Sequence, residues 1–262
     1  MANELIVNSA PAFLNRGNLD TDEVWQAKVD LAAVLRMSAH YGYNEGVDNH
    51  YSALLPGRDD VFLVNPYGYA FEELTASSLL ICDLDGHVLS GTGKPEASAF
   101  WIHARLHKLR PNIRAAFHFH APNSTALCAL KDFPFDWSFQ TSLKFYDRVV
   151  VDEEYNGLAL DDREGDRIAQ SLGNADIVFL QNHGVMVGGP SIAEAWDDLY
   201  YIERASAVQL KIYSSGRESL PVPDAIAREV VKGEREAAPA SGRLHLDAVK
   251  RILDKIQPDY KN

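Results

Sequence analysis

Three histidines have the residue types and the spacing of a metal site. His118 and His120 are separated by one residue in an apolar segment that reads as a β-strand. Alternate side chains of a strand point to one face, so both imidazoles can reach the same ion. His183 lies in a tight turn between two strand-like segments, from which a third imidazole can meet the pair. Three imidazoles with an open fourth position are typical of a catalytic divalent metal centre.

Each part of this pattern also has a purely structural interpretation. A His-x-His pair can arise by chance in a chain with nine histidines. A histidine in a turn can simply bond the backbone, and we expect Gly184 to supply the positive φ that shapes this turn. His103 lies on the apolar face of a predicted helix and is expected to be a core histidine. His50 differs, because it lies in a polar segment leading into a strand, where functional side chains are common.

The segments that must position these histidines alternate between helical and strand-like patterns. Asp20–Asp22 supply N-cap candidates for the first helix, and a capping box of Ser191 and Glu194 opens the longest one. The expected helices are 22–42, 96–110, 161–172, 191–216 and 244–256, and the expected strands are 51–55, 61–64, 79–82, 113–120, 176–180 and 185–187. Because they do not follow a strict βαβ order, we expect an α/β fold with a mixed, largely antiparallel sheet.

The chain divides into three parts by composition. Residues 1–20 are predicted to be an irregular N-terminal arm, and residues 21–216 are predicted to form the α/β domain. Residues 217–262 are predicted to be an appendage, in which 217–242, rich in Pro, Gly, Ala and charge, form a mobile linker before a short helix.

The composition limits what the chain can bind. With 25 Lys+Arg against 37 Asp+Glu the net charge is −12, which makes nucleic acids and anionic membranes poor partners. No apolar run reaches the roughly 18–20 residues of a membrane span, and the N-terminus lacks a secretory signal. The two cysteines, Cys82 and Cys128, are expected to be buried free thiols. The sequence therefore indicates a cytoplasmic protein that acts on a small molecule.

Ordered motifs along residues 22–215 resemble the class II aldolase/adducin family. They lie at residues 44–52, 64–68, 74–77, 83–86, 102–103, 110–111, 118–120 and 181–184, and in the helix from 191. The resemblance implies a three-layer α/β/α fold, and usually a homotetramer with sites between subunits. It implies one divalent metal per chain, held by His118, His120 and His183. Zn²⁺, Mn²⁺, Fe²⁺ and Co²⁺ all accept three imidazoles.

The resemblance also bears on the groups around the metal. It implies substrate binding by the segment from Asn49 to Ser52. The aldolases carry an acid/base glutamate four residues before the histidine that corresponds to His103, and here that position is Ala99. Glu96, three residues further upstream, either points into the same cavity or is a helix N-terminal acid favoured by the dipole.

Other residues are candidates for the missing acid/base and for substrate contacts. His50, or Tyr67 and Tyr69 in a loop, are alternatives to Glu96 as the proton donor. Lys94 is a candidate for anchoring a substrate anion. We also hypothesise that the C-terminal tail folds over a neighbouring site and contributes Tyr260, because a mobile linker is expected before it.

These residues together predict a divalent-metal-dependent C–C lyase that acts through a metal-stabilised enolate. Decarboxylation of a small hydroxy, keto or aromatic acid is favoured, because aldol cleavage needs a base and Ala99 cannot supply one. Class II aldol or retro-aldol cleavage stays an alternative. A non-catalytic, adducin-like interaction module is another, although a pure scaffold has no need of metal ligands. The substrate is expected to be a small anion, since the metal adds local positive charge.

Overall fold

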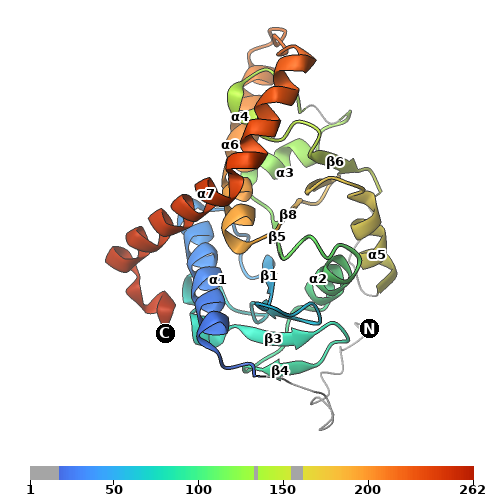
Figure 1. Cartoon of the computed structure of the whole chain (residues 1–262). Coiled ribbons are helices and arrows are strands. Elements are labelled where there is room, and N and C mark those ends of the chain that lie inside the picture. Colours follow the sequence, from blue (N-terminus) through green and yellow to red (C-terminus); the bar gives the residue numbers. More distant parts are fainter. Residues whose placement is uncertain (1–17, 133–134, 155–161) are drawn as a thin grey trace.

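The computed structural model describes residues 18–132, 135–154 and 162–262, and these residues build an eight-stranded sheet between two layers of helices (Figure 1). In spatial order the strands are β4 (Val88–Ser90), β3 (Leu80–Asp83), β2 (Val61–Val64), β1 (His50–Leu54), β5 (Ala115–Phe119), β8 (Val185–Gly189), β7 (Ile177–Leu180) and β6 (Val149–Asp152). Every neighbouring pair is antiparallel except β6 and β7. The predicted mixed, largely antiparallel sheet is therefore confirmed.

Helices cover both faces of this sheet. One layer consists of α2 (Ala97–Leu109) and α5 (Asp162–Ser171), and the other contains α1 (Asp22–Tyr41), α3 (Pro122–Cys128), α6 (Ile192–Ser214) and α7 (Asp224–Ile256). The short helix α4 (Gln140–Leu143) packs against α6 and α7, and the 3₁₀ turns are η1 (Phe71–Glu73), η2 (Ala76–Ser78) and η3 (Pro258–Lys261). Strands β2 and β7 are apolar throughout because both of their faces are covered, and β5 is equally buried but carries His118.

The alternation of side chains on β5 and β1 determines which layer meets the histidines. Phe117 and Phe119 enter the core beneath α1 and α6, whereas Ala116 faces α2 and α5. His118 follows the same alternation as Ala116 and therefore faces α2. On β1, Tyr51 packs in the core on the α1 side, so His50 faces α2 as well.

Several sequence signals act as expected at helix ends. Thr21 caps α1 by accepting a hydrogen bond from the Val24 backbone N–H at 3.2 Å, and Gly42 ends the helix with a φ of 70°. Ser191 caps α6 through its bond from the Glu194 backbone N–H. Cys82 and Cys128 are buried and free, as predicted.

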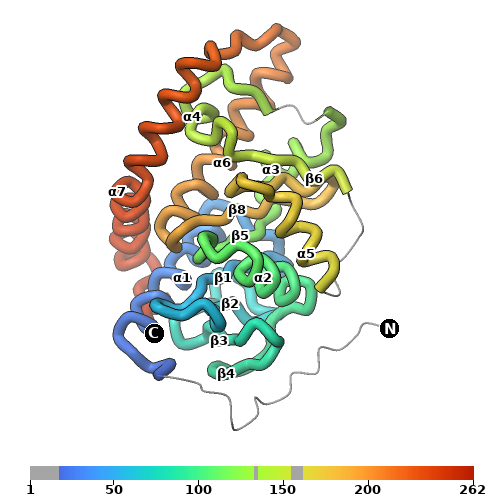
Figure 2. Tube along the Cα trace, turned by 45° about the vertical axis from the view of Figure 1, so that its right-hand side comes forward, coloured from blue at the N-terminus to red at the C-terminus, as the bar shows by residue number. Residues whose placement is uncertain are grey.

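The C-terminal region differs from the prediction of a mobile linker and a short helix. Residues 224–256 form one long helix, α7, which packs on α6 and α1 (Figure 2). Pro239 lies inside this helix, where it removes one backbone hydrogen bond. Gly242 lies so close to α6 that an added Cβ would meet the Ala193 carbonyl oxygen at 3.0 Å. Pro239 and Gly242 are typical of a linker in sequence. In the structure Pro239 lies within the helix, and Gly242 lets α7 approach α6 closely.

The sequence also makes predictions about the N-terminal arm and the membrane-spanning potential of the helices. Residues 1–17 of the predicted N-terminal arm lie outside the described residues. Among the residues that are described, no helix combines the length and the apolar character needed to span a membrane.

Candidate metal centre

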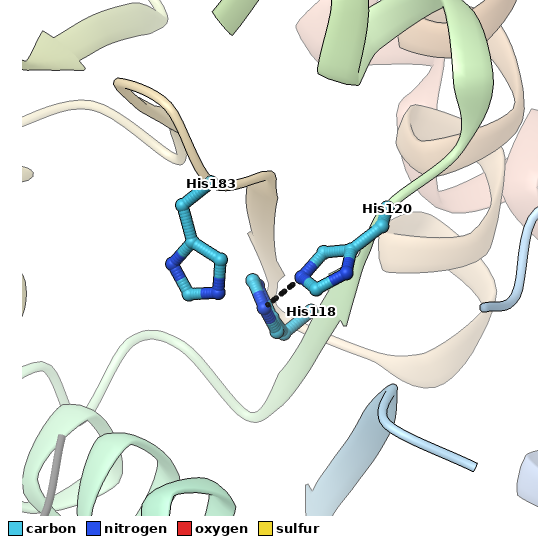
Figure 3. Close-up of side chains that lie close together, drawn as sticks. All are labelled: His118, His120 and His183. Atoms are coloured by element: carbon cyan, nitrogen blue, oxygen red, sulfur yellow. Dashed lines mark hydrogen bonds between the residues drawn. The ribbon is translucent and has the colours of Figure 1, made fainter. Parts of the chain in front are cut away.

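The structure brings together the three histidines that the spacing singles out. His118 is on β5, His120 follows the end of that strand, and His183 is in the turn between β7 and β8. One ring nitrogen from each lies within 4.8 Å of the others, and Figure 3 shows the three rings turned toward a common point. No other group of three or more His, Cys, Asp or Glu side chains converges in this way within the described ranges.

Hydrogen bonds fix which nitrogen of two rings is available to a metal. His118 Nδ1 is 3.1 Å from the Val185 carbonyl oxygen, which can only accept, so Nδ1 carries the proton. His120 Nδ1 is 2.6 Å from Glu45 Oε2 and donates to this carboxylate. Both Nε2 atoms are thus left as lone-pair donors. Such outer partners are the usual way of orienting metal-binding imidazoles.

The two Nε2 atoms provide a test of whether the residues fit a metal. His118 Nε2 and His120 Nε2 are 2.9 Å apart (Figure 3). With both Nδ1 atoms protonated, two neutral rings in this position set lone pair against lone pair. A cation that accepts both lone pairs removes that repulsion, and the third ring, of His183, lies beside it. The donor set therefore fits a borderline divalent cation.

Burial also keeps the cluster in the form that binds metals. Burial, followed by the proximity of His120, lowers the pKa of His183 to about 4. Burial lowers the pKa of His118 well below its usual value, with the neighbouring histidines acting in the same direction. Both rings are therefore neutral at pH 7, and neutral imidazole is the ligand form.

The turn that carries His183 is built differently from the prediction. Asn182, not Gly184, has the positive φ, at 59°, which asparagine tolerates better than most residues. Gly184 is required for another reason, because an added Cβ would lie 2.4 Å from His120 Cδ2 and 2.8 Å from the Phe119 carbonyl oxygen. The glycine thus lets the turn approach the end of β5 closely.

His50 lies beside this cluster. Its Cα pairs with that of His118 across β1 and β5, and the two rings have their centroids 4.8 Å apart. Burial, and then His120 and His183, lower the pKa of His50 to about 3. His50 Nδ1 is 2.7 Å from His103 Nε2. The prediction that His103 is a buried core histidine is confirmed, since it has no exposed surface and both ring nitrogens have partners.

The two substrate-binding residues implied by the family resemblance are both buried. Ser52 has no exposed surface, and its Oγ lies 2.5 Å from His103 Nδ1 and 2.8 Å from His107 Nε2. The structure therefore places the Ser52 hydroxyl between two histidines, whereas the resemblance implies a substrate contact. Asn49 Oδ1 accepts from the Glu45 backbone N–H at 2.7 Å, whereas its buried Nδ2 has no partner among the described residues. Asn49 thus holds the segment that brings Glu45 to His120.

Glu96 and Lys94 lie at the start of α2. Glu96 is the N-cap: its carboxylate accepts from the Ala99 backbone N–H at 2.8 Å and from the Ser98 hydroxyl. Of its two interpretations, the structure supports the helix N-terminal acid. Ala99 itself is fully buried. Lys94 is exposed in the preceding loop, where its carbonyl oxygen accepts from the Tyr67 backbone N–H.

Tyr260 is not brought to the histidines. It lies on η3, has no exposed surface, and its hydroxyl donates to Asp254 Oδ1 at 3.2 Å. η3 packs against α1, and the C-terminus lies beside that helix (Figure 2). The structure thus places this ring in the core of its own chain, whereas the hypothesis takes it to a neighbouring site.

The sequence does not predict the contacts of two residues, Glu45 and His107, that bond to side chains at and beside the three histidines. Glu45, the outer partner of His120, enters the sequence prediction only as part of the motif at 44–52. His107 lies on the same helix as His103 and contacts Ser52, a contact that the sequence does not predict. The i, i+4 spacing of these two histidines on α2 was the available signal, since such residues share one helix face.

Comparison with known proteins identifies relatives along most of the chain. Residues 29–210 match the family model described as the class II aldolase and adducin N-terminal domain. A protein of Caulobacter vibrioides, whose name assigns it provisionally to the class 2 aldolases, is 35% identical over 252 residues, covering 95% of this chain and 97% of its own. Alpha-adducin of Mus musculus is 27% identical over 86% of this chain but only 32% of its own length.

Solved structures agree with these matches. An aldolase II superfamily protein from Pseudomonas syringae superposes with a TM-score of 0.85 at 31% identity, covering 93% of this chain and 98% of its own. L-fuculose 1-phosphate aldolase from Glaciozyma antarctica has a TM-score of 0.78 at 26% identity, covering 91% and 92% respectively. The fold expected from the sequence is thereby confirmed.

Proposed function

The chain belongs to the class II aldolase and adducin family, and we propose that it is a divalent-metal-dependent lyase that breaks a C–C bond. One observation carries the proposal. Three imidazoles converge, and two of them have their Nδ1 protons held by the Val185 carbonyl and the Glu45 carboxylate. Arranged in this way, His118, His120 and His183 would hold the ion. Once bound, a divalent cation supplies Lewis acidity that lowers the energy of the enolate left by C–C cleavage.

Decarboxylation is the reaction we favour. The bond between the substrate carbon and its carboxylate breaks, CO₂ leaves, and the electron pair stays on carbon until a proton is added. No base has to start this reaction. The described acids near α2 and the cluster support it, because Glu96 caps α2 and Glu45 accepts from His120, while Ala99 stands at the aldolase glutamate position. The proposed substrate is a small hydroxy, keto or aromatic acid, whose negative charge suits a cationic centre.

Aldol cleavage is the second candidate, and the position of His50 favours it. Retro-aldol cleavage requires a group that accepts the substrate hydroxyl proton. His50 lies beside His118, and because its Nδ1 is bonded to His103, its Nε2 is the nitrogen left for this role. The similarity to L-fuculose 1-phosphate aldolase supports this alternative, in which a phosphorylated substrate would be the small anion. We also propose that the chain acts as a homotetramer.

A non-catalytic interaction module is the remaining alternative, in keeping with the similarity to alpha-adducin. Metal content distinguishes it from an enzyme. We expect about one Zn²⁺, Mn²⁺, Fe²⁺ or Co²⁺ per chain by elemental mass spectrometry, lost in His118→Ala and retained in His40→Ala, which alters an exposed histidine at the end of α1. A chain without metal, whose stability is the same in both variants, would refute the enzyme proposal.

The two lyase reactions are distinguished by their products. The metal-loaded protein is incubated with a panel of hydroxy acids, keto acids, aromatic acids and aldols, and both CO₂ and aldehyde are measured. We expect CO₂ from an acid and no turnover with His118→Ala. Aldehyde release without CO₂ would replace decarboxylation by aldol cleavage.

A further inference from the structure

A row of buried polar groups runs from α2 to His50. The His107 Nδ1 atom is 3.0 Å from the Ile113 carbonyl oxygen, and His107 Nε2 is 2.8 Å from Ser52 Oγ. Ser52 Oγ is 2.5 Å from His103 Nδ1, and His103 Nε2 is 2.7 Å from His50 Nδ1. None of these side chains has more than 4% of its surface exposed. Water therefore does not compete with the row.

The carbonyl at one end determines the direction of every bond in the row. A carbonyl oxygen only accepts, so His107 Nδ1 must carry the proton and the Nε2 of the neutral ring must accept. The Ser52 hydroxyl therefore donates to His107. With its one proton committed, the Ser52 oxygen must accept from His103 Nδ1. The His103 Nε2 atom is then an acceptor, and His50 Nδ1 donates to it.

This direction holds only if the rings are neutral, and their surroundings make them so. Burial lowers the pKa of His107 to about 4, and burial, with His50 and His107 acting in the same direction, lowers the pKa of His103 well below its usual value. A neutral imidazole has a single N–H, so no ring in the row can donate from both nitrogens. Because the Ile113 carbonyl cannot give or take a proton, the row also cannot reverse its direction.

We propose that His107, Ser52 and His103 are positioning residues that hold His50 in one tautomer, with Nδ1 protonated and the Nε2 lone pair open beside His118. In this tautomer His50 accepts a hydrogen bond from a hydroxyl of the bound substrate. The role toward substrate rests on the proposed function, whereas the tautomer itself does not. The substrate class narrows accordingly to acids or aldols that carry a hydroxyl group, since a plain keto acid offers no such donor.

The tautomer can be observed directly. We would label the full chain with ¹⁵N-histidine and record long-range ¹H–¹⁵N correlation spectra of the protein as purified and after addition of Zn²⁺. The His50 ring is assigned by its loss in His50→Asn. We expect a protonated Nδ1 and an unprotonated Nε2 for His50. We expect Ser52→Ala, which removes the hydroxyl from the row, to shift the His50 signals toward a mixture of tautomers.

Matched variants separate this effect from simple loss of a buried hydroxyl. Ser38→Ala removes another buried serine, which bonds the Tyr51 hydroxyl at 2.9 Å on the opposite face of β1, and should leave His50 unchanged. Ser52→Thr keeps the hydroxyl and should restore the wild-type spectrum. If Ser52→Ala does not fold, His107→Leu removes the acceptor of the same hydroxyl and should give the same mixture.

Two results would overturn the proposal. The first is a wild-type His50 with its proton on Nε2, which is read from the wild-type spectrum once the ring is assigned. The second is a single unchanged His50 tautomer in Ser52→Ala or His107→Leu. Neither result depends on turnover. A protein that has the expected tautomers but neither binds metal nor cleaves any substrate would count against the proposed function alone.

Discussion

Removal of the Glu45 carboxylate should weaken metal binding without unfolding the protein. Glu45 Oε2 accepts from His120 Nδ1 at 2.6 Å, which turns His120 Nε2 toward the other two rings. Loss of such an outer partner typically reduces metal affinity 10–100-fold. Glu45 is 65% exposed at its side chain, so solvent screens its charge and the low end of this range applies. We expect Glu45→Ala to bind Zn²⁺ about 10-fold more weakly, which corresponds to about 1.4 kcal/mol.

The assay is competition for Zn²⁺ against a chromophoric chelator at pH 7.5. The backbone N–H of residue 45 still bonds Asn49 in the variant, so the thermal midpoint of the metal-free protein should not change. Glu72→Ala removes the same charge from an exposed position on η1 and controls for long-range electrostatics. Unchanged affinity in Glu45→Ala, or an equal loss in Glu72→Ala, would refute the assignment of Glu45 as the partner that orients His120.

Three more predictions concern the turn, the pH dependence and the C-terminus. Gly184→Ala should lower Zn²⁺ affinity more than Glu45→Ala does, because the new methyl overlaps the His120 ring; equal affinity in the same competition assay would contradict this. The metal-free protein should lose stability as the pH falls from 6.5 toward 4, since His107 and His183 take up protons only when unfolded. Below pH 6.5 each of these two histidines lowers the free energy of unfolding by about 1.4 kcal/mol per pH unit. Urea midpoints that are equal at pH 7.5 and 5.5 would therefore argue against buried neutral rings. Tyr260→Ala should cost about 3–5 kcal/mol and Tyr260→Phe only about 1 kcal/mol in urea unfolding; a mild Tyr260→Ala would show that this ring is not a core residue.

The sequence predicted those parts of the centre that depend on local spacing. The alternation of a strand is sufficient to pair His118 with His120, and a turn between two strands is sufficient to direct His183 toward them. The partners of these rings depend instead on tertiary contacts. Glu45 reaches His120 from a segment 75 residues away in sequence, and no local pattern records that approach.

The same distinction explains where the structure differs from the sequence expectations. Ser52 reads as a polar residue of a substrate-binding segment, and only the packing of α2 against β1 shows that histidines occupy its hydroxyl. Pro239 and Gly242 normally argue against a helix, but a long helix tolerates both when its neighbours supply the packing energy. Tyr260 follows a region that was expected to be mobile, so its burial against α1 could not be foreseen.

The pairing of His50 with His118 across β1 and β5 also limits how related chains can change in length. Insertion or deletion of one residue within β1 would turn its side chains to the opposite face, and would replace His50 at the cluster by a neighbour from the core side. Deletion of two residues would restore the face but bring Ser52 opposite His118. Natural length variation among homologues should therefore avoid β1 and concentrate in exposed loops such as residues 91–94, which lead into α2.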